Sequence, residues 1–126
     1  MRTGGGGTEY KLSPNGSNWT ETTLYSVVQN GHAVGRLFRD SAGNLYNATQ
    51  DGGAFNYGQI FQLTPSGGNW IYTDLHDFTG GSDGGNPIGG VIVDSSGNVY
   101  GTAWFGGANL CGGGSYSCGT VWEITP

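Results

Sequence analysis

The feature that most constrains the fold of this chain is a short motif that occurs three times. It reads GTEYKLSP at residues 7–14, GQIFQLTP at 58–65 and GTVWEITP at 119–126. Longer stretches repeat too, since residues 7–27 match 58–78 at eight of twenty-one positions and residues 35–53 match 89–107 at eight of nineteen. This predicts a repeat protein. We assign one domain over 1–126, with a first repeat at about 7–57, a second at about 58–118 and an extra strand at 119–126.

Each repeat contains four short runs that are bounded by Gly, Pro, Asn and Ser, which is typical of β-strands. No window of eleven or more residues has the apolar period of a helix, so we predict none. The predicted strands are 8–13, 19–27, 36–40, 44–49, 59–64, 70–78, 91–94, 98–104 and 120–125.

The connections between these runs carry turn residues with a physical role. In the stretches 40–44 and 94–98 (DSAGN and DSSGN), Asp can accept hydrogen bonds from the following backbone, and Gly can adopt a positive φ. Both stretches are therefore predicted hairpin turns. Pro14 and Pro65 lack the N–H that would extend a strand, so we expect the preceding strands to end there.

Four antiparallel strands in each unit of about fifty residues are typical of a β-propeller blade. The chain holds two blades' worth of strands plus one. The runs at 91–93 and 121–124 lack a clean polar face, as expected for strands covered on both faces. A β-sandwich is the alternative all-β architecture.

Composition and charge exclude several classes of partner. The formal net charge is −5, with four Lys and Arg residues in all, so the basic surface needed for nucleic-acid binding is missing. No apolar run is long enough to span a membrane. The first residues lead into glycines rather than into the apolar core of a signal peptide.

Cys111 and Cys118 are the two cysteines, and they flank a glycine-rich stretch. A zinc site is disfavoured because no second CxxC or neighbouring His accompanies them. A local disulfide is the favoured interpretation and would indicate an oxidising, extracellular or cell-surface location. Two free thiols are the alternative.

The stretches GQIFQLTPSGGNWIYTDLHDF, GGSDGGNP, GGVIVDSSGNVYGTA and FGG carry a resemblance to a known family. The chain resembles the bacterial GloVer-type tandem repeats of choice-of-anchor extracellular proteins. The resemblance covers nearly the whole chain after Thr3, with a more divergent first copy that has residues 28–32 in place of the GGSDGxNP loop. It implies a secreted, propeller-like repeat protein, and it offers no catalytic residues to carry over.

Candidate catalytic and metal-binding groups are few. Asp74 and His76 share a strand face beside Asp77, but the first repeat has Thr23, Tyr25 and Ser26 there and no activated serine motif accompanies them. We therefore predict that the chain is not an enzyme and has no cofactor. Asp83 is a weak calcium candidate, because a single carboxylate is few for an ion that takes six to eight oxygens.

Aromatic side chains suggest a second kind of site. Trp19 and Trp70 occupy equivalent places in the two repeats, which favours packing, whereas Trp104 and Phe105 have polar counterparts. Together with Tyr116 they could stack on the apolar faces of sugar rings. A carbohydrate-binding module is therefore the alternative function.

The strand count predicts self-assembly. Grouped as blades, the strands form a trailing pair (8–13 and 19–27), one complete blade (36–78) and a leading trio (91–125) without its fourth strand. A second copy could supply that strand, joining chains head to tail into a ring or a filament. The residues expected at this junction are Trp19, Leu24, Val27, Val121, Trp122 and Ile124.

Overall fold

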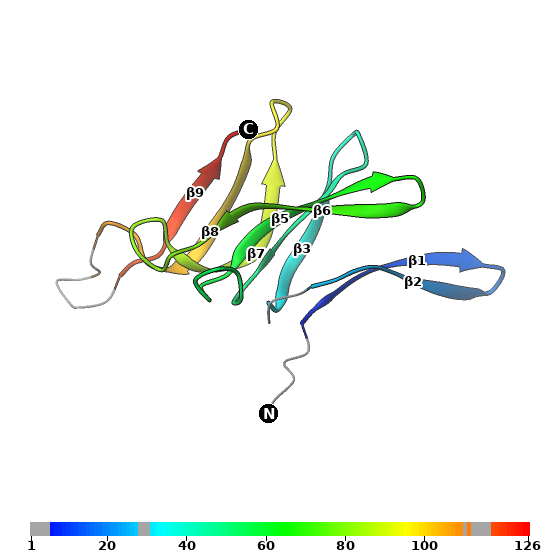
Figure 1. Cartoon of the computed structure of the whole chain (residues 1–126), viewed down its shortest axis with the longest axis horizontal. Coiled ribbons are helices and arrows are strands. Elements are labelled where there is room, and N and C mark those ends of the chain that lie inside the picture. The colour runs from blue at the N-terminus through cyan, green and yellow to red at the C-terminus, as the bar shows by residue number, and fades with distance from the viewer. Residues whose placement is uncertain (1–5, 28–30, 110, 112–116) are drawn as a thin grey trace.

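The computed structural model describes residues 6–27, 31–109, 111 and 117–126, and within them the chain forms nine β-strands and no helix (Figure 1). In the sequence, each stretch between two consecutive strands contains at least one glycine. The strands are β1 (Thr8–Asn15), β2 (Asn18–Ser26), β3 (Ala33–Arg39), β4 (Leu45–Thr49), β5 (Gln59–Ser66), β6 (Asn69–Asp77), β7 (Gly85–Val93), β8 (Val99–Phe105) and β9 (Thr120–Ile124).

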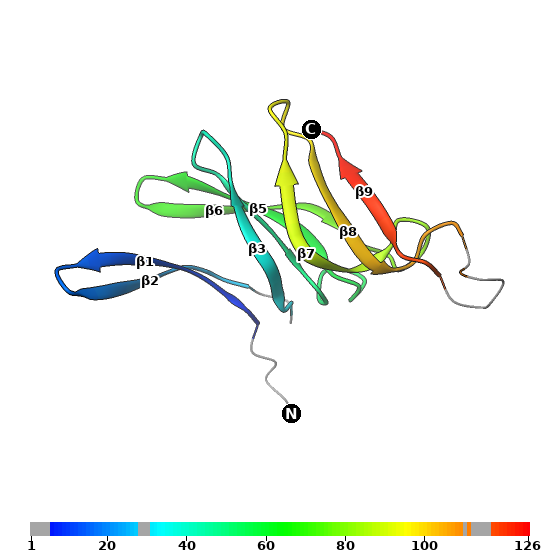
Figure 2. The ribbon, with the colours of Figure 1, turned by 180° about the vertical axis from the view of Figure 1, so that it is seen from behind.

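The strands pair into three antiparallel sheets. The first sheet is the hairpin β1–β2, the central sheet has the order β3-β4-β5-β6, and the last has the order β7-β8-β9. The hairpin and β9 lie at opposite ends of the molecule (Figure 2). The all-β class and the predicted grouping into a pair, a complete set of four and a trio are confirmed; the three sheets are consistent with propeller-like blades and with a sandwich.

The central sheet is covered on both faces, because alternate residues of its strands point to opposite sides. On one side Tyr46, Ala48 and Ile60 pack with Val91 and Val99 of the last sheet. On the other side the buried residues Leu45, Phe61 and Leu63 pack with the hairpin, including Val27, Leu24 and Tyr25. Two hydrophobic cores therefore join three sheets in sequence order.

The predicted strand ends at Pro14 and Pro65 are wrong. The strands continue past both prolines, with Pro14 paired to Trp19 and Pro65 paired to Trp70. A missing N–H is tolerated there because β1 has no second neighbour among the described strands, and β5 has run past Leu45, the residue at which β4 begins. A two-residue turn then closes each hairpin, and Gly16, Gly67 and Gly68 in these turns have positive φ.

The first strands of the central and last sheets, β3 and β7, begin earlier than predicted. β3 starts at Ala33 instead of residue 36, and β7 starts at Gly85 instead of residue 91. In both strands a bulge interrupts the pairing, between Val34 and Phe38 and between Ile88 and Val91. At these bulges β3 and β7 come so close that a side chain at Gly35 would overlap the backbone of Gly90.

Both predicted Asp turns are present. Asp40 accepts hydrogen bonds from the backbone and side-chain nitrogens of Asn44 at 2.9 and 2.8 Å. Asp94 accepts the same two bonds from Asn98, both at 2.9 Å. Among the described residues, none lies in a helix that is long and apolar enough to cross a membrane.

Candidate functional site

The first element of the candidate site is the open edge of β9. In the last sheet β9 is paired with β8 on one side, and no described strand lies on its other side. The equivalent strand of the central sheet, β5, is paired on both sides, with β4 and with β6. An unpaired edge presents free N–H and C=O groups that can template another strand.

The second element is the outer face of the last sheet, which we define as Ile88, Ile92 and Val121. Val121 is 83% exposed and Ile92 is 64% exposed, whereas Ile60, the repeat equivalent of Val121, is 0% exposed. These residues line a hollow of about 320 Å³. The expectation that β7 and β9 are covered on both faces is wrong for this chain, because no further described sheet covers the outer face.

A second hollow, the edge hollow, opens between the central and last sheets next to β9. Its volume is about 360 Å³, and its lining includes Gln62, Leu75, Val99 and Ile124. Trp122 also lies between these two sheets and contacts Phe78 edge to face at 5.6 Å. A hollow beside an open strand edge is the place where the side chains of a fourth strand would lie.

The hairpin β1–β2 carries the other predicted junction residues. Leu24 and Val27 pack against the central sheet of their own chain, and Val27 lies one residue beyond β2. Trp19 instead is 66% exposed. The structure therefore divides the predicted residues into those used internally, namely Leu24, Val27, Trp122 and Ile124, and those left exposed, namely Trp19 and Val121.

A buried polar pair between the hairpin and the central sheet escaped sequence reasoning. Glu9 is 8% exposed and Asn47 is 3% exposed, and the Asn47 side-chain nitrogen donates a 2.7 Å hydrogen bond to the Glu9 carboxylate. Glu9 stands where the other two motif copies have Ile60 and Val121. That substitution of a charged residue for an apolar one was the available signal.

The acidic and histidine residues of β6 and the following turn form a local network. The ring nitrogen Nε2 of His76 lies 3.3 Å from the Asp83 carboxylate. Burial would raise the pKa of Asp83, but hydrogen bonds from Thr79 outweigh it and hold the pKa below its usual value. Partial burial, followed by the neighbouring Asp77 carboxylate, raises the pKa of Asp74.

This network does not assemble a metal centre. The Asp83 carboxylate accepts a 2.8 Å bond from the Thr79 backbone and a second bond from its hydroxyl, which fixes it within the turn. Within residues 6–27, 31–109, 111 and 117–126, no group of three His, Cys, Asp or Glu side chains is placed to hold a metal ion.

The predicted sugar-stacking residues are only partly together. Trp104 is 71% exposed and shares the outer side of β8 with Tyr100 and Thr102 by strand alternation. Phe105 instead packs edge to face on Tyr57, with ring centroids 5.4 Å apart. Tyr116 lies outside the described residues.

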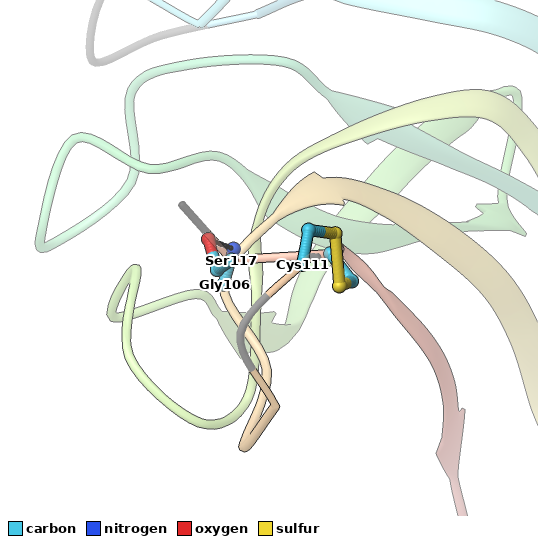
Figure 3. The surroundings of a disulfide bond; sticks show 4 residues. Gly106, Cys111 and Ser117 are labelled. Carbon is cyan, nitrogen blue, oxygen red and sulfur yellow. Dashed lines mark hydrogen bonds between the residues drawn. A yellow bond between two sulfur atoms is a disulfide. The ribbon is translucent and has the colours of Figure 1, made fainter. Parts of the chain in front are cut away.

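The predicted disulfide is present. Cys111 and Cys118 are bonded, with Cα atoms 5.1 Å apart. Figure 3 shows the bond next to the contact between Ser117 and Gly106, in which the Gly106 backbone donates a 2.7 Å hydrogen bond to the serine hydroxyl. The disulfide therefore closes a short stretch of the connection between β8 and β9.

Three related antiparallel sheets with an internal motif define an all-β repeat protein. The chain belongs to the Gloeobacter/Verrucomicrobia repeat family, whose model matches residues 2–126. No curated protein and no solved structure matches the chain. Family and fold together make it a structural repeat module.

Proposed function

We propose that this chain is a non-catalytic, extracellular structural module that assembles head to tail by strand complementation. In the assembly, β2 of one copy pairs with the open edge of β9 in the next copy and completes the last sheet. Each copy then keeps its own complete central sheet. It supplies three strands, β7, β8 and β9, to the sheet that it shares with one neighbour, and it supplies β2 to the sheet that it shares with the other neighbour. The assembly closes into a ring or continues as a filament, depending on the rotation between copies.

The observation that carries this proposal is the exposure of residues whose repeat equivalents are buried. Ile60 is 0% exposed because the last sheet covers it, whereas Val121 at the same place in the motif is 83% exposed. A matching vacancy lies at the other end of the chain, where a hollow of about 480 Å³ is lined by Leu24, Leu37, Leu45 and Trp70 among others. A shared sheet that joins β7, β8 and β9 of one copy with β2 of a second copy would cover both surfaces.

The extracellular location is supported by the disulfide, because such bonds persist in oxidising compartments. The non-catalytic character rests on the use of the candidate groups in structure. The carboxylate of Asp77 accepts a 3.0 Å hydrogen bond from the Ala54 backbone, and that of Asp83 holds its own turn.

Assembly is tested by sedimentation velocity and light scattering at micromolar concentration, with negative-stain imaging to separate rings from filaments. The parent chain should be oligomeric. Val121→Lys places a charge on the outer face and should raise the concentration for half-assembly at least about tenfold. Ser95→Lys adds the same charge to an exposed turn and should assemble like the parent. A well-folded monomeric parent chain would rule the proposal out.

Carbohydrate binding is the second candidate, and the exposure of Trp104, at 71%, favours it. A polysaccharide pull-down compares the parent chain with Trp104→Ala. Loss of retention in the variant supports a sugar-stacking role. Equal retention of both proteins counts against it.

A further inference from the structure

The interface between the central sheet and the hairpin shows how the side chains of a fourth strand fill the space between two neighbouring sheets. The fourth strand there is β6. Trp70 of β6 lines the hollow beside Leu24 and Leu45, and Tyr72 stacks against two other rings. Its ring centroid lies 5.5 Å from that of Phe61 and 4.9 Å from that of Tyr25.

The interface between the central and last sheets has equivalent positions, but no side chains there correspond to Trp70 and Tyr72, because the last sheet has no described fourth strand. When the repeats are aligned, Trp122 occupies the position of Phe61, and His76 occupies the position of Tyr25. The edge hollow lies where Trp70 would be, because its lining residues Leu75 and Val99 are the equivalents of Leu24 and Leu45.

A polar atom at this interface also lacks a partner. The indole nitrogen Nε1 of Trp122 is buried and has no hydrogen-bond partner among the described residues. A buried N–H without an acceptor is costly, so native structures usually provide one. The missing fourth strand is the element that would lie against this indole.

Strand β2 carries one side chain that fits the edge hollow and another that can accept a hydrogen bond from Trp122 Nε1. In the repeat alignment Trp19 takes the place of Trp70, and Glu21 takes the place of Tyr72. Both are exposed, and they point to the same side of β2 because they are two residues apart. Glu21 pairs with Leu12 as Tyr72 pairs with Leu63, which places Glu21 opposite Ile124 in a completed last sheet.

We infer that Trp19 of a second copy fills the edge hollow, and that Glu21 of that copy accepts a hydrogen bond from Trp122 Nε1 and faces His76. This inference rests on the proposed strand complementation and specifies its register. In one chain β2 is paired with β1, and in the assembly the same edge of β2 would pair with β9 of another copy. The inference therefore requires that β9 stays paired with β8 and that β1 of the incoming copy is displaced from β2.

Strand β9 is packed more tightly against its own chain than β1 is, so β1 is the strand expected to be displaced. Trp122 lies over Gly101, its direct partner on β8, and a side chain at Gly101 would overlap the indole. In β1 the equivalent aromatic residue, Tyr10, is 55% exposed. Displacing β1 breaks the bond between Glu9 and Asn47, whereas displacing β9 would empty the core around Trp122.

Cross-linking of full-length chains tests the register. Chains with Glu21→Cys are mixed with chains with Ile124→Cys under oxidising conditions, and the linked peptides are identified by mass spectrometry. We expect the 21–124 link between copies, since these residues are direct partners in the inferred sheet. The control pair, Thr22→Cys with Ile124→Cys, places one thiol on the opposite face and should link poorly.

Substitutions test the two contacts separately. Trp19→Ala should raise the concentration for half-assembly at least about tenfold, because it empties the hollow, whereas Thr20→Ala on the other face should leave it within about twofold. Glu21→Gln keeps an acceptor for the indole and removes a negative charge that would lie near Asp83, the neighbour of His76, so it should assemble at least as well as the parent. Glu21→Leu has no acceptor and should assemble less well.

The outcomes separate this inference from the proposed function. Oligomers that form without the 21–124 link, or that tolerate Trp19→Ala, overturn the register and leave strand complementation standing. A parent chain that stays monomeric overturns both. The 21–124 link, together with weaker assembly of Trp19→Ala and Glu21→Leu, supports the inferred contact.

Discussion

At the scale of single residues, one aspartate closes each of the two matching turns. Asp40 accepts two hydrogen bonds from Asn44 and a third, at 3.2 Å, from the Tyr46 hydroxyl. Asp94 makes the equivalent bonds to Asn98 and Tyr100. Burial would raise the pKa of Asp40, but the bonds from Asn44 outweigh it, so its pKa lies below the usual value.

A lowered pKa in the folded state means that the Asp40 carboxylate stabilises the fold above about pH 4, and that this contribution is lost as the pH falls through the folded-state pKa. Asp40→Asn places an amide donor against the Asn44 donor. We expect it to lower the free energy of unfolding by about 1–2 kcal/mol at neutral pH.

At an acid pH below the folded-state pKa of Asp40 the parent carboxylate is also protonated, so the difference between parent and variant should shrink. Denaturant unfolding at both pH values measures it. Ser41→Ala, at an exposed turn position, serves as the control and should have little effect. A difference that is the same at both pH values would contradict this account.

At the scale of elements, the sequence pattern predicted the strands and their grouping because alternation and turn residues are local signals. The Asp turns were predictable for the same reason. The continuation of β1 past Pro14 was not, because it depends on the absence of a neighbouring strand on that side. The early start of β7 depends on a close approach to β3, which sequence alone does not reveal.

The loop closed by Cys111 and Cys118 provides an element-scale prediction. Replacing both cysteines by serine removes a cross-link that restricts the unfolded chain, and should lower the free energy of unfolding by roughly 2–3 kcal/mol. Thermal unfolding of the parent with and without reductant checks this. The double serine variant is the matched control, since reductant should leave its melting temperature unchanged.

At the scale of the whole molecule, sequence reasoning predicted the incomplete sheet on which the candidate site is built, but not which of its side chains are exposed. Counting strands predicted an incomplete last sheet, and the structure contains that sheet. Which junction residues are exposed depends on how three sheets stack, and that stacking buries Leu24 and Val27 partly or fully while it leaves Trp19 and Val121 exposed. The lack of a hydrogen-bond partner for the buried Trp122 Nε1 likewise depends on the stacking of the sheets and could not be predicted from the sequence.

The opposite positions of the hairpin and of β9 have a consequence for growth (Figure 2). Two unlike ends give any head-to-tail assembly a direction, so a copy that is damaged at one end can still add through the other and then stop elongation. Val121→Lys mixed as a minor component into the parent should act as a chain terminator. It should shorten filaments, or trap open oligomers in place of closed rings, in proportion to its share, and sedimentation velocity measures that shortening.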